Sequence, residues 1–232
     1  MQPIDIHYIF KFKDKKENHV HAKLNARTLD LIADLPETLP PWTDLDFHQC
    51  PNCPLSVQTH PKCPVAVHLV KLLEDFEQLQ SHDIINVEIM TPERITFHET
   101  SAQKGLSSLL GLIMSTCGCP HMEFFKPMAR FHLPFANSLE TTFRAVSMYM
   151  IAQYFRKKKG LQADLELEGL KKIYSNIQII NAAMADRLRA ITSRDVALNA
   201  LVVLDIFAQS VPFSIDESLD EIRHLFTSYL FR

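Results

Sequence analysis

The hydrophobic pattern of this chain changes once, near residue 100, and this change limits the folds open to it. Before it, residues 4–12 and 19–25 alternate apolar and polar side chains around a charged tip, which predicts an antiparallel hairpin. Residues 84–90 and 95–100 predict two further strands, and residues 64–80 predict a helix. The first half is therefore expected to follow the order β-β-loop-α-β-β.

The second half carries its apolar side chains at helical spacing. Helices are expected over residues 101–116, 121–130, 137–156, 165–190, 194–209 and from Ser214 onward. Asn137 with Glu140, and Ser214 with Glu217, have the residue types of a helix-starting cap. The chain has only 5 glycines, which favours helices with short connections over many tight hairpins.

These patterns together predict an α+β fold. Residues 1–100 are expected to form a small antiparallel sheet with one helix and a metal-binding loop, and residues 101–232 a five- to six-helix bundle packed as one unit with the first part. Apolar residues make up 47% of the chain, enough for a sizeable core.

Charge and hydropathy exclude several classes of partner. The formal net charge is −3, so no basic surface for nucleic acid or an anionic membrane is expected. No stretch approaches the roughly 20 apolar residues that span a bilayer, and the N-terminus lacks the features of a signal peptide. We therefore expect a cytoplasmic protein, in which five cysteines serve as ligands or reactive groups more readily than as disulfides.

The cysteine loop, residues 48–64, carries the strongest chemical signal of the sequence. It reads HQCPNCP and, after five residues, HPKCP. Cys50 and Cys53 stand three positions apart, so a tight turn can aim both sulfurs at one metal ion. Cys63 follows ten residues later, and zinc ions and iron–sulfur clusters usually take four protein ligands. One ligand is therefore missing from the loop.

Cys119 is the best candidate for the fourth ligand. Pro64 follows Cys63 and Pro120 follows Cys119, each at the start of an expected helix, and proline favours the first helical position. A cysteine at such a helix start is expected to have a lowered pKa, because unpaired N–H groups and the helix dipole stabilise its thiolate. Cys117 ends the preceding helix, and we interpret it as a small buried apolar side chain.

Five histidines are weaker candidates for a ligand: His48, His60, His68, His121 and His132. His68 falls on the apolar face of its helix, where a hydrogen-bonded core histidine is the simpler interpretation. His48 and His60 flank the cysteines and suit a ligand, a supporting or a solvated role. His121 and His132, with Glu123, have the residue types of a second, open metal site but match no strong spacing.

The ligand set suits two cofactors. A structural zinc ion is favoured by the Cys-Pro-x-Cys turn, and a [4Fe–4S] or [2Fe–2S] cluster is the alternative because distant fourth cysteines and Cys-Pro pairs also occur in iron–sulfur proteins. Unrelated buried thiols that bind nothing remain a third interpretation.

Three functions from different classes stay open. The first is a non-enzymatic metal-binding protein whose zinc site joins the two halves, and the second is an iron–sulfur protein with a redox or enzymatic role. The third is a protein-interaction adaptor without metal chemistry, which would expose a large apolar patch. No phosphate-binding loop or nucleophile elbow is present, so no catalytic residue or reaction is assigned. Asp205 lies on an otherwise apolar helix and needs a partner, for which Arg144 or Arg187 is expected.

Nearly the whole chain resembles a family of uncharacterised bacterial proteins. The resemblance rests on the strings HQCPNCPL, HPKCPVAVHLV, GLSSLLGLIMSTCGCPHM and RFHLPFA. It implies that the positions of Cys50, Cys53, Cys63 and Cys119 are kept in the family, whereas a small residue often stands at the position of Cys117. The family has no assigned activity, so the resemblance implies no mechanism.

Overall fold

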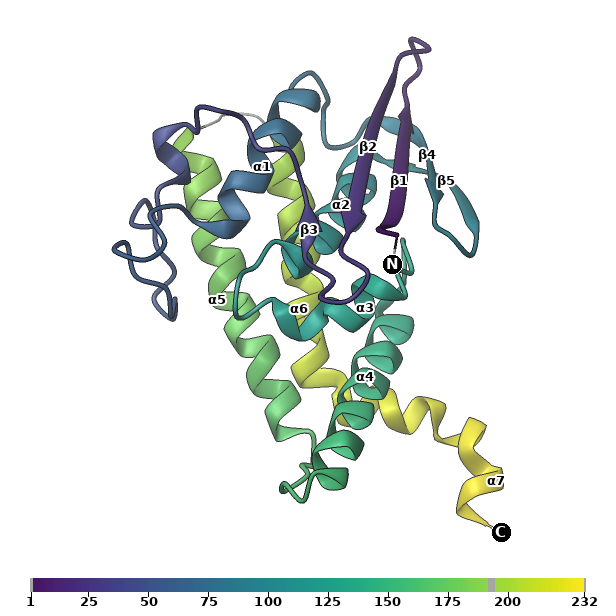
Figure 1. Ribbon diagram of the computed structural model, residues 1–232. Helices are drawn as coiled ribbons and strands as arrows, with labels where there is room; N and C mark the ends of the chain where they lie inside the picture. The colour runs from purple at the N-terminus through teal and green to yellow at the C-terminus, as the bar shows by residue number, and fades with distance from the viewer. Residues whose placement is uncertain (1, 192–194, 232) are drawn as a thin grey trace.

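The computed structural model describes residues 2–191 and 195–231 (Figure 1), and at positions 195, 207 and 210–218 it describes the backbone alone. The strands are β1 (Ile4–Lys11), β2 (Glu17–Leu24), β3 (Leu31–Ile32), β4 (Ile84–Met90) and β5 (Ile95–Ser101). The α-helices are α1 (Pro64–Asp75), α2 (Ala102–Thr116), α3 (Lys126–Arg130), α4 (Ser138–Lys158), α5 (Glu168–Ile191), α6 (Asp195–Ile222) and α7 (Thr227–Leu230).

The strands form one antiparallel sheet in the order β3-β2-β1-β4-β5, which confirms the predicted α+β fold. β1 is central: Ile6 pairs with Ala22 of β2, and Tyr8 pairs with Ile89 of β4. The predicted hairpin corresponds to β1–β2, and the two further predicted strands are β4 and β5, which pair with each other. β3 was not predicted, because a strand of two residues has no alternation that a pattern could show.

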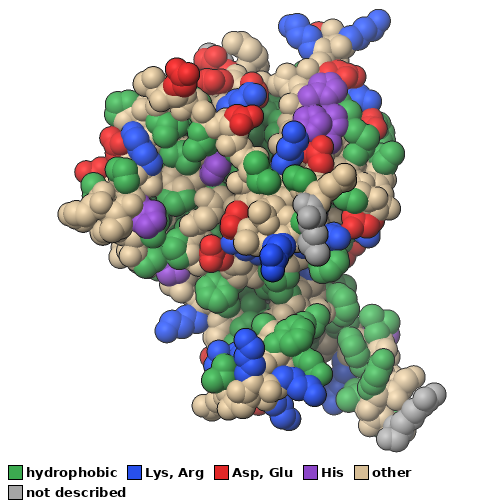
Figure 2. All heavy atoms as spheres, in the orientation of Figure 1, with side chains coloured by type: hydrophobic (Ala, Val, Ile, Leu, Met, Phe, Trp, Pro, Cys, Tyr) green, Lys and Arg blue, Asp and Glu red, His purple; other side chains and the backbone are tan. Residues whose placement is uncertain are grey.

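One face of the sheet is buried under α1 and α2. Tyr8 and Phe10 point to this face and are fully buried, and the Phe10 ring meets the edge of Phe76, just after α1, with centroids 4.7 Å apart. The opposite face carries polar side chains, as an antiparallel sheet with one solvated face requires. His7 and His21 stack there with centroids 3.9 Å apart, and Figure 2 shows this histidine cluster in purple beside the hairpin tip.

The helical half packs directly on the sheet half. α5 and α6 run side by side, and α2 and α4 also contact α6 (Figure 1). A single hydrophobic cluster includes Tyr8 of β1, Leu109 of α2 and Ile180 of α5, so the core runs across the predicted boundary at residue 100. The predicted cap of α4 is confirmed, since Asn137 Oδ1 accepts from the Glu140 N–H at 2.9 Å and Glu140 Oε2 accepts from the Asn137 N–H at 2.8 Å.

Two predicted helices differ from the structure. Residues 121–130 form a turn, a short 3-10 helix (Glu123–Phe125) and the five-residue α3. The predicted break between 209 and 214 is wrong, since α6 continues through Pro212; a proline removes one N–H donor and can kink a helix without ending it. Figure 1 shows the C-terminal part of α6 leading away from the bundle toward α7.

Arg194, where the fourth long helix was expected to begin, lies outside the described residues, as do the side chains of Ser214 and Glu217. Across 2–191 and 195–231, no helix is both long enough and apolar enough to cross a membrane.

Candidate functional site

The four predicted ligands come from three separate segments of the chain. Cys50 and Cys53 lie on one tight turn, in which the Cys53 N–H donates to the Cys50 carbonyl oxygen at 2.9 Å. Cys63 is the N-cap of α1 with a proline in the first turn, as predicted. Its N–H donates to the Thr43 carbonyl oxygen at 2.8 Å, which fixes the cysteine loop against the short 3-10 helix Pro41–Thr43. Cys119 lies in the turn that follows α2.

The electrostatics of the thiols show that the fold gathers these segments. Burial, with smaller contributions from Cys63, Cys119 and Cys53, raises the pKa of the Cys50 thiol to about 12. Burial also raises the pKa of Cys119 to about 11, with smaller contributions from Cys63 and Cys53. One thiol affects the pKa of another only over short distances. The four sulfurs, called the four-cysteine region below, therefore share one neighbourhood.

This neighbourhood is not a closed metal site in the present arrangement. All five cysteines are free thiols. Over the part of the chain that the structure describes, no three His, Cys, Asp or Glu side chains stand in a group that could hold a metal ion. Binding of an ion would therefore require the sulfurs to move toward one another, and ligation by these four residues stays a prediction.

The environment of Cys119 corrects one sequence-based expectation. Cys119 was expected to begin a helix that lowers its pKa, but the helical backbone begins only at Glu123. Burial instead raises the pKa of Cys119, since removing a thiolate from water outweighs the local dipoles. The N–H groups of His121 and Met122 donate to its sulfur and offset part of that rise.

Cys117 is separated from the others in its bonding. Its thiol is 8% exposed and donates to the Met114 carbonyl oxygen at 3.2 Å at the C-terminal end of α2. Burial raises its pKa above the usual range of a thiol, and Cys119 and Cys63 add to that rise, so Cys117 also lies near the four-cysteine region. Gly118 follows with a φ of 89°, which lets the chain reverse toward Cys119. The predicted burial of Cys117 is confirmed, and its exclusion from the ligand set stays a prediction.

His121 connects two of the cysteine-bearing segments. Its Nε2 donates to the carbonyl oxygen of Asn52, between Cys50 and Cys53, at 2.7 Å. The Asn52 amide in turn donates to Oδ1 of Asn176 on α5 at 3.2 Å. The imidazole therefore holds the turn after α2 against the cysteine loop, and this bond occupies one of its two nitrogens.

The remaining histidine candidates have other neighbours. His48 has a φ of 49° and lies edge-on to Phe47, with ring centroids 4.9 Å apart. His60 is exposed and bonds to the Thr59 hydroxyl at 3.0 Å. His68 is half-buried on α1, and burial lowers its pKa. None of the three belongs to a group of described side chains that could hold a metal ion.

The weaker second metal site, built from His121, Glu123 and His132, is not assembled. Glu123 pairs with Lys126 at 3.2 Å, while His121 bonds to the cysteine loop. His132 instead bonds to the Tyr8 hydroxyl of the central strand. The three side chains therefore engage different parts of the fold.

Arg187 of α5 lies beside the four-cysteine region, a position that the sequence analysis did not predict. It is 2% exposed, and it donates to the carbonyl oxygens of Trp42, Asp44 and Leu45, with the Asp44 contact at 2.7 Å. Its Nε is buried without a hydrogen-bond partner, and no carboxylate among the described residues lies within ion-pair distance. Burial lowers its pKa, while the neighbouring Cys63 and Cys50, and then the carboxylates of Asp44 and Asp46, raise it.

The predicted partner of Asp205 is wrong. Asp205 accepts hydrogen bonds from Asn181 at 3.2 Å and from Gln209 at 2.5 Å, and from neither Arg144 nor Arg187.

A signal for the buried position of Arg187 was present in the sequence. Arg187 lies three residues after Met184 and seven after Ile180, so it falls on the apolar face of α5.

Comparison with known protein families gives one match. A family model described as "Domain of unknown function (DUF6901)" covers residues 6–227. No curated protein and no solved structure matches the chain. The match agrees with the resemblance to an uncharacterised family, while the bacterial source that the resemblance implies stays a prediction.

Proposed function

The chain belongs to this family of unknown function, and we propose from its own residues that it is a metal-binding protein. Cys50, Cys53, Cys63 and Cys119 would hold one structural zinc ion that joins the sheet half to the helical half. The observation that carries the proposal is the convergence of four thiols from three segments beside the buried Arg187. The cytoplasmic location and the absence of nucleic-acid and membrane partners remain predictions.

The charge of Arg187 supports an anionic centre at this place. A buried guanidinium without a carboxylate partner is costly, because its charge has left water without full compensation. Four thiolates around Zn²⁺ would carry a net charge of about −2, which a neighbouring cation stabilises. The unpaired Nε of Arg187 is a donor of the kind that bonds to a ligating sulfur.

The bonds around the thiols support a joining role. The His121–Asn52 bond already holds the turn after α2 to the cysteine loop, and Asn52 holds that loop to α5. A metal ion bound by Cys119 and by the cysteine loop would strengthen the same connection. A loss of the metal should therefore loosen the contact between the two halves of the protein.

Metal analysis of the full chain, purified without oxygen, tests this proposal. We expect about one zinc ion per chain and no visible absorption, because Zn²⁺ has a filled d shell. Iron with sulfide and a brown colour would support the iron–sulfur alternative with the same ligands. A preparation that contains neither metal and takes up neither on reconstitution would overturn both.

Two serine variants locate the site. Cys53→Ser should lose the metal and lower the melting temperature, since a structural metal site contributes directly to folding. Cys117→Ser is the matched control and should keep the metal content of the natural chain. Retention of metal and melting temperature by Cys53→Ser, or loss of metal in the control, would show that the ligand set is wrong.

A protein-interaction role is the second candidate, and exposed apolar side chains favour it. They occur on α4, on α7 and at the C-terminal end: Phe143, Ile151, Phe155, Tyr229 and Phe231. Figure 2 shows apolar side chains gathered on the lower part of the molecule, over α4 and α7. Exposed apolar patches of this kind mark interaction surfaces.

A second copy of the chain is the first partner to test. Sedimentation at increasing concentration should show association, which Phe155→Ser should weaken. A monomer at every concentration would count against self-association as the function of this surface.

A further inference from the structure

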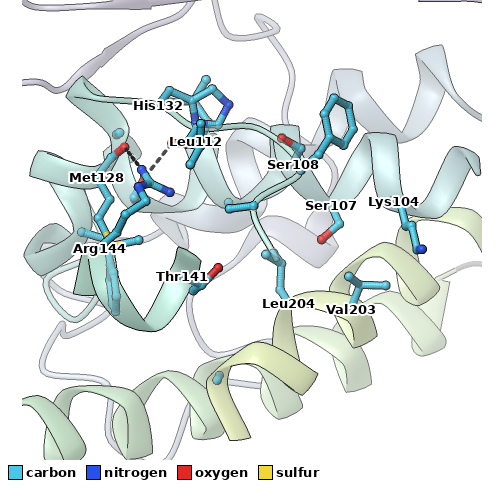
Figure 3. Close-up of a pocket in the computed structure, with 18 of the residues that line it drawn as sticks. Lys104, Ser107, Ser108, Leu112, Met128, His132, Thr141, Arg144, Val203 and Leu204 are labelled. Carbon is cyan, nitrogen blue, oxygen red and sulfur yellow. Dashed lines mark hydrogen bonds between the residues drawn. The ribbon is translucent and has the colours of Figure 1, made fainter. Parts of the chain in front are cut away.

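A cavity of about 420 Å³ lies between β5, α2, α4, α5 and α6 (Figure 3). Its volume falls within the range of small-molecule sites in proteins, roughly 300–1,000 Å³. The residues that enclose it come from both halves of the protein, from His98 of β5 to Ala208 of α6. The cavity is therefore a product of the complete fold.

Small side chains on one face of α2 make this space. Ser107, Gly111 and Ser115 follow at intervals of four, so they line the same side of the helix. The facing walls are largely apolar and include Phe125, Met128, Tyr174 and Leu204. An apolar body of moderate size would bury its surface here in exchange for water.

Arg144 of α4 brings an incompletely paired cation to the wall. Its Nη2 donates to the carbonyl oxygens of Met128 and Phe131, both at 3.0 Å. Nη1 and Nε find no acceptor in the described part of the chain, and no carboxylate there lies within ion-pair distance. In Figure 3 the two bonds hold the guanidinium at one end of the cavity, with Lys104 at the other.

His132 neither neutralises the positive charge of Arg144 nor adds a second positive charge beside it. Burial lowers the pKa of His132 to about 4, and the nearby Arg144 contributes to that shift. The imidazole is therefore neutral at physiological pH and bonds to the Tyr8 hydroxyl. Arg144 thus remains available to an anionic group, for which its planar donors are well suited.

Asn181 gives independent support for a ligand in the cavity. It lines the cavity, is 2% exposed, and uses its Nδ2 to donate to Asp205 at 3.2 Å. Its Oδ1 is buried without a hydrogen-bond partner. An unpaired buried acceptor costs about 1–3 kcal/mol, and a donor on a bound molecule would remove that cost.

We propose that this cavity binds a small, mainly apolar organic anion that carries a hydrogen-bond donor. Its anionic group pairs with Arg144 and its apolar body lies along the small face of α2. Its donor bonds to Asn181 Oδ1 after a small movement of that side chain, because neighbouring atoms cover the oxygen in the ligand-free structure. Lys104 is exposed at the opposite end and marks the entrance. This inference is independent of the metal proposal, because none of the four cysteines lines the cavity.

Two dyes test the ligand class on the full chain. Anilinonaphthalene sulfonate combines an aromatic body, an N–H donor and an anion, whereas phenylnaphthylamine lacks only the sulfonate. Both become fluorescent in an apolar site, so each affinity follows from a titration. Arg144→Gln should weaken binding of the sulfonate about tenfold, the value of one charge-assisted interaction. It should change binding of the uncharged dye less than about twofold.

Matched variants separate this cavity from other apolar surfaces. Arg94→Gln removes an exposed arginine from the turn after β4 and should leave both affinities unchanged. Ser107→Leu fills the cavity and should abolish binding of both dyes, while Phe155→Ser, on the exposed face of α4, should leave it intact. Equal affinities in the natural chain, Arg144→Gln and Ser107→Leu, with unchanged circular dichroism, would overturn the proposal.

Discussion

Arg187 and Arg144 are two arginines that the fold places in opposite surroundings. Arg187 donates to three carbonyl oxygens and lies beside thiols of the four-cysteine region. Arg144 donates to two carbonyl oxygens through a single nitrogen and otherwise faces a cavity. The first guanidinium is part of how the chain holds its own loop in place. In the second guanidinium, Nη1 and Nε have no acceptor in the described part of the chain, which is the arrangement expected where a ligand binds.

Replacement of each arginine by methionine should give the largest contrast. Arg187→Met leaves three carbonyl oxygens without their donor and should lower the free energy of unfolding by about 4 kcal/mol. Arg144→Met should cost only about 1 kcal/mol, because the loss of two bonds is offset by relief of a partly desolvated charge. Urea unfolding followed by circular dichroism measures both. Equal losses of unfolding free energy in the two variants would contradict this contrast between the two arginines.

Acidification should act on the cavity region through His132. Its pKa is about 4 in the folded protein and about 6.5 when unfolded, so between these values the unfolded chain binds a proton that the folded chain does not. The free energy of unfolding should therefore fall by about 3 kcal/mol as the pH drops from 6.5 to 4, and this contribution should not change further below 4.

His132→Gln is the control for that pH dependence. Glutamine can still bond to the Tyr8 hydroxyl but does not titrate, so the difference between natural chain and variant isolates His132 from Arg144, Tyr8 and the other groups around it. Urea unfolding at a series of pH values gives this difference. Parallel curves for the two proteins would show that the folded chain does not hold His132 neutral.

The two faces of α2 should respond oppositely to an added methyl group. A Cβ at Gly105 would lie 3.1 Å from Val87 and 3.4 Å from Phe10 in the packed sheet interface, so Gly105→Ala should destabilise by about 1 kcal/mol. At Gly111 the nearest atom is Leu204 Cδ2 at 3.4 Å, an ordinary contact beside the cavity.

Gly111→Ala should therefore stabilise by up to about 1 kcal/mol through helix propensity. Thermal melts of both variants against the natural chain provide the measurement. The same sign of change for both would show that the two faces are packed alike.

The smallest effect is expected at the entrance of the cavity. Lys104 is exposed and has no ion pair within the described ranges, so Lys104→Gln should change the free energy of unfolding by less than about 0.5 kcal/mol. It should weaken binding of the sulfonate dye less than Arg144→Gln does, because an exposed charge is screened by water and salt. A loss of dye affinity as large as that of Arg144→Gln would show that the anion binds at the Lys104 end of the cavity, which would contradict the proposal.

The sequence predicted the parts of the fold that depend on periodic burial. Strands β1, β2, β4 and β5 and helices α2, α4 and α5 follow the alternating or helical spacing of their apolar residues. β3 and the continuous α6 were missed for physical reasons. A two-residue strand depends on its neighbour for pairing, and the helical backbone tolerates Pro212.

The candidate sites were predictable to a smaller extent. Residue types and spacing pointed to the cysteines, and the N-cap position of Cys63 was confirmed. The role of Arg187 was not predictable, since its acceptors are backbone carbonyls more than 140 positions away, which no side-chain pattern reveals. The cavity was not predicted either. It depends on how α2, α4, α5 and α6 meet, and the small residues of α2 alone do not show what faces them.

The central position of β1 has a consequence during synthesis of the protein. β1 leaves the ribosome well before its second neighbour, β4, which lies about 80 residues later in the chain. Until β4 emerges, the hairpin of β1 and β2 exposes an open edge and the apolar face of Tyr8 and Phe10. Open edges of this kind pair readily with other chains. We therefore expect the hairpin of β1 and β2 to be prone to pairing with other chains until β4 has been made.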